Sequence, residues 1–298
     1  MVVEELEHVL DRVLPDGGFK DFLRRQYRRR HNPYHALDPL VARAEPQPDG
    51  TLLVEMKDGT RLKGPRDDFV YRVFEMAVPE KIPTLLPYGH WSIFFVVLAE
   101  EFARDVYGLT GSVGPGDVVV DLGGHIGGFT VRAARQVGPT GRVISIEAAP
   151  ENYRLLTENV ALNGFANVVA VNKGVWSRKT RLELKLSGLS GGHSLEERYQ
   201  NVHERGDVEV VEVAPLDDLL ADLGVARVDF VKMDIEGAEL EALEGMRRTL
   251  ASSHPRLAIA AYHRVDGAPT YPRVVRFLRE LGFDARARAG IVYARKRG

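Results

Sequence analysis

The chain has 298 residues, and its 40 Lys and Arg against 42 Asp and Glu give a formal net charge of −2. A near-neutral chain has no global field that attracts nucleic acid or an anionic membrane. The absence of cysteine excludes disulfides, a thiol nucleophile and cysteine-ligated metal. The longest apolar run, residues 93–99, is too short to span a bilayer, and the amino terminus lacks the basic-then-apolar order of a signal peptide. We therefore expect a cytoplasmic protein without a membrane partner.

Residues 1–110 form the first of two expected regions. Helical periodicity predicts helices near 6–14, 19–31, 68–76 and 91–107. Residues 51–62 predict a hairpin around an Asp-Gly turn. The basic cluster at 24–31 is interpreted as a solvated helix face, with recognition of phosphate or an acidic substrate as the alternative. We expect this mainly helical region to be accessory to the rest of the chain, as a lid.

Residues 111–298 alternate strands with helices, which is typical of a parallel sheet. The predicted core strands are 117–122, 142–147, 168–172, 228–234, 256–262, 283–288 and 291–295, and the predicted helices are 129–136, 150–163, 238–250 and 271–281. Strands at 180–187 and 207–213 flank a polar loop at 188–206 and form an excursion from this pattern. The fold class is therefore α/β, with a seven-stranded Rossmann-like sheet.

A glycine-rich turn, Asp121-Leu122-Gly123-Gly124-His125-Ile126-Gly127, follows the apolar strand residues 118–120. Glycines let the backbone turn tightly and approach a ligand, because they carry no side chain. The free amides of a helix that starts next point toward the same place. This strand–turn–helix order predicts a nucleotide-type cofactor pocket at the carboxyl edge of the sheet.

The identity of the cofactor follows from the spacing of the glycines. A dinucleotide fingerprint needs a glycine where this chain has His125. The observed pattern, D-x-G-x-x-x-G, instead resembles motif I of the methyltransferases that use S-adenosylmethionine (SAM). Glu147 ends the next predicted strand, where a carboxylate can accept hydrogen bonds from ribose hydroxyls.

Further motifs carry a resemblance to the FkbM family of class I, SAM-dependent methyltransferases. Residues 231–239, Val-Lys-Met-Asp-Ile-Glu-Gly-Ala-Glu, resemble the family's K-x-D-x-E-G-x-E signature, and residues 114–121, 159–163 and 216–220 add to the similarity. The resemblance implies a seven-stranded sheet whose last strand is antiparallel, SAM as the cofactor, and O-methylation of a small-molecule hydroxyl such as that of a natural product or sugar. Where the family usually has Ala-Asn, this chain has Gly124-His125, so an asparagine contact to the amino-acid end of the cofactor is either missing here or supplied by His125.

The expected cofactor-binding residues lie at the carboxyl ends of three strands. Asp121 is placed near the charged amino-acid end of SAM, with a helix-cap role as the alternative. Glu147 is placed at the ribose. The full expected set is Asp121, Gly123, Gly124, His125, Gly127, Glu147 and Asp234.

The expected catalytic residues are Asp234, Glu236 and His263, which follow the fourth and fifth strands. Asp234 is the first choice for a general base, with Glu236 or His263 assisting. Asp234 and Glu236 are also the ligands that Mg²⁺ would take, and the sequence leaves this choice open. For Glu239 a structural role at the start of the next helix is at least as well supported. His193 is interpreted as a residue of a mobile surface loop.

Other functions remain as alternatives at this stage. They are a nicotinamide-dependent oxidoreductase, which His125 argues against, a non-catalytic binding module, and an RNA or protein methyltransferase, which the near-neutral charge argues against. The sequence names neither the methyl acceptor nor the oligomeric state, so a homo-oligomer stays open.

Overall fold

A computed structural model describes residues 36–37, 39–66, 92–187, 191–196 and 204–296. The helices expected near 6–14, 19–31 and 68–76, and the basic cluster at 24–31, lie outside these ranges. Within them, no helix has the length and apolar content that a membrane crossing requires.

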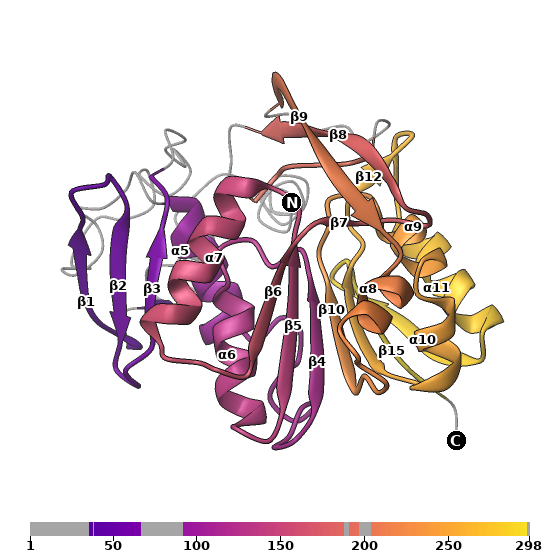
Figure 1. Ribbon diagram of the computed structural model, residues 1–298, viewed down its shortest axis with the longest axis horizontal. Helices are drawn as coiled ribbons and strands as arrows, with labels where there is room; N and C mark the ends of the chain where they lie inside the picture. The colour runs from indigo at the N-terminus through magenta and orange to yellow at the C-terminus, as the bar shows by residue number, and fades with distance from the viewer. Residues whose placement is uncertain (1–35, 38, 67–91, 188–190, 197–203, 297–298) are drawn as a thin grey trace, which may run out of the picture.

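The centre of the molecule is a seven-stranded sheet in the order β14-β15-β11-β10-β4-β5-β6 (Figure 1). Strand β15 is antiparallel to both of its neighbours, and the remaining neighbours are parallel. The predicted sheet, including its antiparallel last strand, is therefore confirmed. The strands are β4 (Val118–Leu122), β5 (Arg142–Glu147), β6 (Val168–Asn172), β10 (Phe230–Met233), β11 (Arg256–Ala260), β14 (Phe283–Arg288) and β15 (Ile291–Lys296).

Helices cover both faces of the sheet, and the alternation of side chains along each strand assigns every strand residue to one face. On β4, Val119 packs in the cluster that contains Phe129 of α6 (Gly128–Val137), whereas Val120 packs in the cluster that contains α10 and α11. Both faces of the central strands are thus buried, which explains their nearly continuous apolar sequences. The other helices are α7 (Pro150–Leu162), α8 (Leu216–Asp222), α9 (Glu239–Glu244), α10 (Arg247–Ser252) and α11 (Tyr271–Glu280).

The single helix expected at 238–250 is wrong, because two helices, α9 and α10, occupy this segment. A side chain on Gly245 would collide with the backbone of Trp176, so the chain passes too close for a regular helix of larger residues. The side chain of Asp217 then accepts the backbone amides of Arg248 and Thr249 at 2.8 Å each and caps the first turn of α10.

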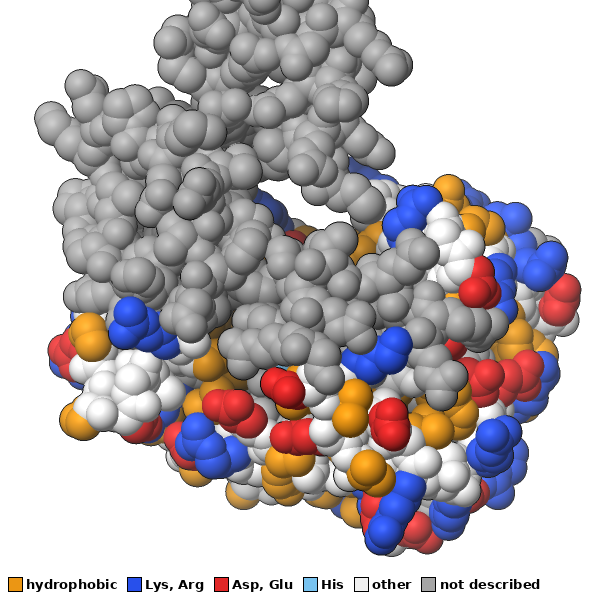
Figure 2. Space-filling view, turned by 90° about the horizontal axis from the view of Figure 1, so that it is seen from above, with side chains coloured by type: hydrophobic (Ala, Val, Ile, Leu, Met, Phe, Trp, Pro, Cys, Tyr) orange, Lys and Arg blue, Asp and Glu red, His pale blue; other side chains and the backbone are white. Residues whose placement is uncertain are grey.

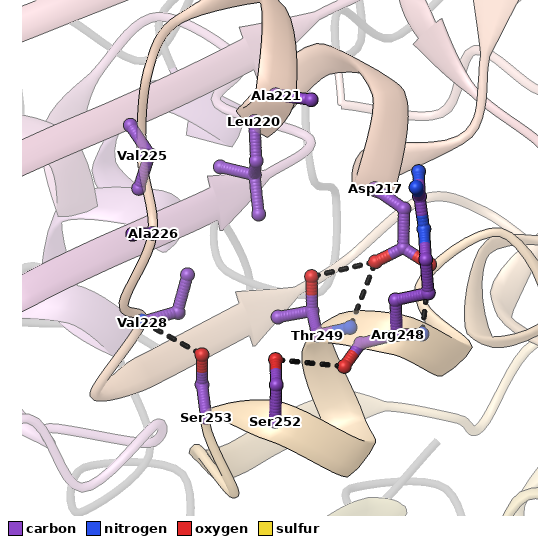
Figure 3. A pocket seen from close by; sticks show the side chains of 10 residues that line it. All are labelled: Asp217, Leu220, Ala221, Val225, Ala226, Val228, Arg248, Thr249, Ser252 and Ser253. Atoms are coloured by element: carbon purple, nitrogen blue, oxygen red, sulfur yellow. Dashed lines mark hydrogen bonds and ion pairs between the residues drawn. The ribbon is translucent and has the colours of Figure 1, made fainter.

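A cavity of about 180 Å³ lies beside this cap, between α8, α10 and the residues that precede β10 (Figure 3). Its polar side chains are bonded within the protein: Thr249 Oγ1 donates to Asp217, Ser252 Oγ donates to the carbonyl of Arg248, and Ser253 Oγ accepts from the amide of Val228. The cavity is far from the carboxyl edge of the strands, so we assign it a packing role.

A small antiparallel sheet precedes the central domain and lies beside α7 (Figure 1). The expected hairpin is confirmed as β2 (Leu52–Met56) and β3 (Arg61–Gly64). A further strand, β1 (Val41–Pro46), was not predicted; a register shift near Val41 removes the regular alternation that would have indicated it.

The helix expected at 91–107 is partly confirmed. It runs as α5 (Ser92–Leu98) and continues as a short π-helix, η2 (Ala99–Ala103). It ends there because Asp105 has φ +49° and its carboxylate accepts the amides of Leu109 and Thr110, which turns the chain.

Two asparagines, Asn159 on α7 and Asn163 at its C-cap, attach the small sheet to the central sheet domain. Asn159 is fully buried; its amide nitrogen donates to the carbonyls of Lys63 and Ile126, and its oxygen accepts the Lys63 amide at 2.7 Å. Asn163 exchanges two hydrogen bonds with the backbone of Arg61 in the same way. One turn apart on the helix, these side chains pair the open edge of β3 as a neighbouring strand would.

Replacing Asn159 by alanine is expected to lower the free energy of unfolding by about 3 kcal/mol, because one buried and two part-buried backbone groups lose their hydrogen-bond partner. Chemical denaturation would measure this change. Asn163→Ala is the matched control; its bonds are exposed, and we expect a loss of about 1 kcal/mol. Equal losses at the two positions would contradict the role given to Asn159.

Candidate functional site

The glycine turn after β4 lies directly against the end of β10. Gly123 and Gly127 have φ values of +76° and +89°, which favour glycine. A Cβ on Gly123 would collide with the carbonyl of Asp234, so glycine is required for the turn to approach Asp234. The turn and the expected catalytic acid thus form one site at the carboxyl edge of the sheet.

Asp121 is engaged inside the protein. It is fully buried; Oδ1 lies 3.0 Å from Lys232 Nζ, and Oδ2 accepts a hydrogen bond from Thr130 at 2.6 Å. Asp121 and Lys232 are register partners on β4 and β10, so both face α6. This ion pair orders the turn, because Lys232 Nζ also donates to the carbonyl of Gly123 at 2.6 Å.

The charge of Lys232 is retained in this buried position. Burial lowers the pKa of the ammonium, but the carboxylates of Asp121 and Asp234 outweigh that effect and raise the pKa above its ordinary value. The ammonium also lies 5.5 Å from the ring centre of Tyr107 and 5.9 Å from that of Phe129. Lys232 is therefore a permanent cation beneath the glycine turn.

Glu147 is buried at the end of β5, where the sequence predicts it. One carboxylate oxygen accepts the amide of His125 and the other the amide of Ala149, each at 2.8 Å. Burial raises the pKa of Glu147 to about 7 despite these hydrogen bonds. Each oxygen keeps a further lone pair, so the carboxylate holds the glycine turn and can still accept hydroxyls.

Asp234 follows β10 and is held by a residue that the sequence analysis missed. Tyr107 donates its hydroxyl to Asp234 Oδ2 at 2.7 Å. Burial, together with the charge of Asp234, raises the pKa of Tyr107 well above its ordinary value, so Tyr107 remains a donor. The other oxygen, Oδ1, accepts no hydrogen bond among the described residues and lies 3.4 Å from His263 Nε2.

Glu239 holds the imidazole ring of His263 in position through Nδ1. This nitrogen lies 2.7 Å from Glu239 Oε1, and the buried carboxylate also accepts hydrogen bonds from the amide of Gly237 and the hydroxyl of Thr270. Burial lowers the pKa of His263, but Glu236 and Glu239 outweigh burial and raise it well above its ordinary value. His263 is therefore an imidazolium at neutral pH. Glu239 is the first residue of α9, as expected, and its contact with His263 is a further role that the sequence did not indicate.

The three expected catalytic residues are brought together. One ligand atom from each of Asp234, Glu236 and His263 lies within 4.8 Å of the other two. His263 Nε2 is 3.4 Å from Glu236 Oε1, the same distance that separates it from Asp234. Glu236 has φ +52°, a rare conformation for this residue type that functional sites often retain.

The segment between β6 and α8, which departs from the strand–helix alternation, contacts the cluster of Asp234, Glu236 and His263. It consists of β7 (Gly174–Val175), β8 (Thr180–Ser187) and β9 (Glu204–Ala214), with β8 and β9 extending across the top of the view in Figure 1. Ser194 is buried and donates its hydroxyl to the carbonyl of Glu236 at 2.6 Å. Residues 194–196 are buried and His193 is half-buried, so the expected surface position of this loop is wrong for residues 194–196.

His193 belongs to the same returning segment. Its Nδ1 accepts the amide of Ser187 at 3.0 Å, and it lies near enough to His125 to influence that residue's titration. Burial first, and then His193 and Lys232, lower the pKa of His125 to about 3, so His125 is neutral. A neutral imidazole offers one donor and one acceptor beside the glycine turn, as the side chain of asparagine does.

Two acids on η2 complete the surroundings, and the sequence analysis passed over both. Burial and the charge of Asp234 raise the pKa of Glu100 to about 7, and burial raises that of Glu101 to about 8. Their signal in the sequence is the position of two adjacent acids inside the apolar stretch 93–103.

These pKa values predict that the ligand-free protein loses stability as pH rises. Glu147, Glu100, Glu101 and His263 all bind protons more strongly when folded, so the free energy of unfolding falls as they deprotonate. His125 acts in the opposite direction, but only below its unfolded pKa. We expect the melting temperature to fall between about pH 6.5 and about pH 8.5, with a smaller fall in Glu147→Gln. A rise over this range would contradict the assignments.

Comparison with known proteins matches this chain to a methyltransferase family and to individual methyltransferases. The profile of the methyltransferase FkbM domain matches residues 121–285. The methyltransferase sdnD of Sordaria araneosa is 29% identical over 193 residues, which cover 56% of this chain and 73% of that protein. The 31-O-demethyl-FK506 methyltransferase FkbM of Streptomyces tacrolimicus is 29% identical over 207 residues, covering 60% and 77%. Among solved structures, the precorrin-6y C5,15-methyltransferase of Geobacter metallireducens matches with a TM-score of 0.42 and 18% identity, covering 65% of this chain and 88% of that one.

Proposed function

The chain belongs to the FkbM family of SAM-dependent methyltransferases, and on this premise we propose that it transfers the methyl group to a hydroxyl of a small molecule. The observation that carries the proposal is the cluster of Asp234, Glu236 and His263 beside the glycine turn. A relative that acts on 31-O-demethyl-FK506 supports a hydroxyl as the acceptor.

The residues at the glycine turn fit SAM. Glu147 offers buried acceptor oxygens for the ribose hydroxyls, and the turn of Gly123 to Gly127 leaves room for the ligand to approach the backbone. When bound, the cofactor supplies an already activated methyl group, so the protein's main tasks are alignment of the acceptor and removal of its proton. Asp234 lies against the turn and is placed for both tasks.

Asp234 is the proposed general base. Tyr107 occupies Oδ2, so Oδ1 would take the proton that the acceptor hydroxyl loses as the methyl group passes from sulfur to the acceptor oxygen. His263 is a cation 3.4 Å from Oδ1 and cannot itself accept that proton while it is protonated. We therefore assign His263 to positioning: its charge holds the carboxylates of Asp234 and Glu236 side by side.

A metal-assisted reaction is the competing mechanism at the same residues. Asp234 and Glu236 would be the oxygen ligands of Mg²⁺, which prefers oxygen donors. His263 between them already compensates their charge, and its nitrogen is a poor partner for Mg²⁺. The donor set therefore favours the metal-free base.

The test is methyl transfer from labelled SAM to a panel of small-molecule alcohols, sugars and phenols, with amines and carboxylic acids beside them. We expect product only with hydroxyl acceptors, and undiminished rates in a chelator. Transfer to nitrogen alone would contradict O-methylation, and a loss of rate that Mg²⁺ restores would favour the metal mechanism.

RNA is the less favoured acceptor class. On the part of the described surface that Figure 2 shows, Lys and Arg side chains are interspersed with Asp and Glu. A face that follows a phosphate backbone would concentrate positive charge instead.

Replacing Glu147 by alanine is expected to weaken SAM binding about 10- to 100-fold, because two charge-assisted acceptors at the ribose are lost. Isothermal titration calorimetry measures the affinity directly. Glu151→Ala, a change of an exposed acid at the start of α7, serves as the control. Unaltered affinity in Glu147→Ala would refute the ribose role.

A further inference from the structure

Glu101 is a buried acid that the proposed methyl transfer does not use. It lies on η2, its exposed fraction is 8%, and its Oε2 has no hydrogen-bond partner among the described residues. Leaving a carboxyl oxygen buried and unpaired costs free energy, so such an atom points to a missing partner.

The carboxyl group lies at the start of α6, the helix that follows the glycine turn. The backbone amide of Phe129, in the first turn of α6, donates to it. Gly128 lacks the side chain that would collide with Oε2, so the carboxyl group packs directly against the first residue of the helix. The carboxyl group of Glu101 therefore lies beside the glycine turn, at the start of α6.

The charged groups around Glu101 come from four elements. Lys232 on β10 attracts its charge, whereas Asp121 on β4 and Glu100 on η2 itself repel it. On α6, the guanidinium of Arg132 is bonded to the backbone carbonyl of Glu101 and to the carboxylate of Asp105. Burial outweighs the attraction of Lys232 and raises the pKa of Glu101 to about 8, so the ligand-free acid is mostly protonated at neutral pH.

We propose that Glu101 binds the ammonium group of the amino-acid end of SAM and gives up its proton as it does so. Asp121, the residue expected in this role, has its oxygens engaged by Lys232 and Thr130. Glu147 lies on the next strand, at the side assigned to the ribose. Asp234 Oδ1 also accepts no hydrogen bond among the described residues, but Asp234 is assigned to the acceptor hydroxyl, which leaves Glu101 Oε2 for a cationic ligand. The inference rests on SAM as the cofactor and is independent of the acceptor.

The experiment is calorimetric titration of the whole protein with three ligands. S-adenosylhomocysteine and decarboxylated SAM both carry the ammonium group, whereas 5′-methylthioadenosine lacks the entire amino-acid end. In Glu101→Gln, we expect the first two to bind about 10- to 100-fold more weakly than in the unmodified protein, and 5′-methylthioadenosine to bind equally well. Equal losses for all three ligands, or no loss for any, would overturn the proposal.

Two further readouts keep the test decisive. Titrations at neutral pH in buffers of different ionisation enthalpy should show that S-adenosylhomocysteine releases more protons from the unmodified protein than 5′-methylthioadenosine does, because only the first ligand reaches Glu101. This measurement needs no variant, so it holds even if Glu101→Gln folds poorly. Equal proton release with the two ligands would contradict the proposal, as would a loss in Glu101→Gln confined to ligands with the carboxylate. Because no methyl acceptor is present, failure here is distinguishable from failure of O-methylation.

Discussion

Replacing Asp234 by asparagine is expected to lower the rate of methyl transfer about 100- to 10,000-fold, the range typical of a lost general base. Asparagine keeps an oxygen that can accept the hydroxyl of Tyr107, so the local geometry is retained. Its amide cannot take a proton from the acceptor hydroxyl. The affinity for SAM should change little, because the cofactor's adenosyl group is assigned to the glycine turn and Glu147.

Single-turnover rates with labelled SAM would measure the chemical step, and calorimetry would measure cofactor affinity on the same preparations. Asp222→Asn, at the exposed end of α8, is the matched control and should leave both quantities unchanged. An undiminished rate in Asp234→Asn would remove Asp234 from the mechanism. Parallel loss of rate and cofactor affinity would assign it to binding instead.

Replacing Lys232 by methionine is expected to lower the free energy of unfolding by about 3–5 kcal/mol, the cost of leaving a buried charge without its partner. The side chains of Lys232 and Asp121 are 5% and 0% exposed, so water cannot replace the ammonium. The carbonyl of Gly123 would lose a donor as well. We therefore expect the glycine turn to lose order together with the ion pair.

Denaturant unfolding would measure this loss, with Arg256→Met as the matched control. Arg256 pairs with Asp117 near the start of β4, but its side chain is 44% exposed, so its removal should cost less than about 1 kcal/mol. Adding Asp121→Asn to Lys232→Met should recover part of the stability, because no isolated charge remains. Equal losses for Lys232→Met and Arg256→Met would contradict the role given to the buried pair.

The central sheet could be predicted from the sequence because its strands are buried on both faces. Short β-branched runs such as Val118–Val120, followed by a glycine turn, indicate buried strands, and β5, β6 and β14 have the predicted bounds. The break between α9 and α10 could not be predicted in this way. It depends on Asp217, which lies on α8 and caps α10 only in the folded chain.

The site was predictable where its residues follow a strand and share one edge. Asp234, Glu236 and His263 converge for this reason. The pairing of Asp121 with Lys232 depends instead on the register of β4 against β10, which no local pattern encodes. Tyr107 and Glu101 reach the site from the segment before the sheet, where neither helical periodicity nor composition indicates their contacts.

The decisive measurement is the structure of the complex with S-adenosylhomocysteine. We expect the ribose hydroxyls to lie within hydrogen-bond distance of Glu147 and the sulfur to lie over the glycine turn, facing Asp234. A ligand bound with its sulfur turned away from Asp234, or with Glu147 out of reach of the ribose, would contradict it.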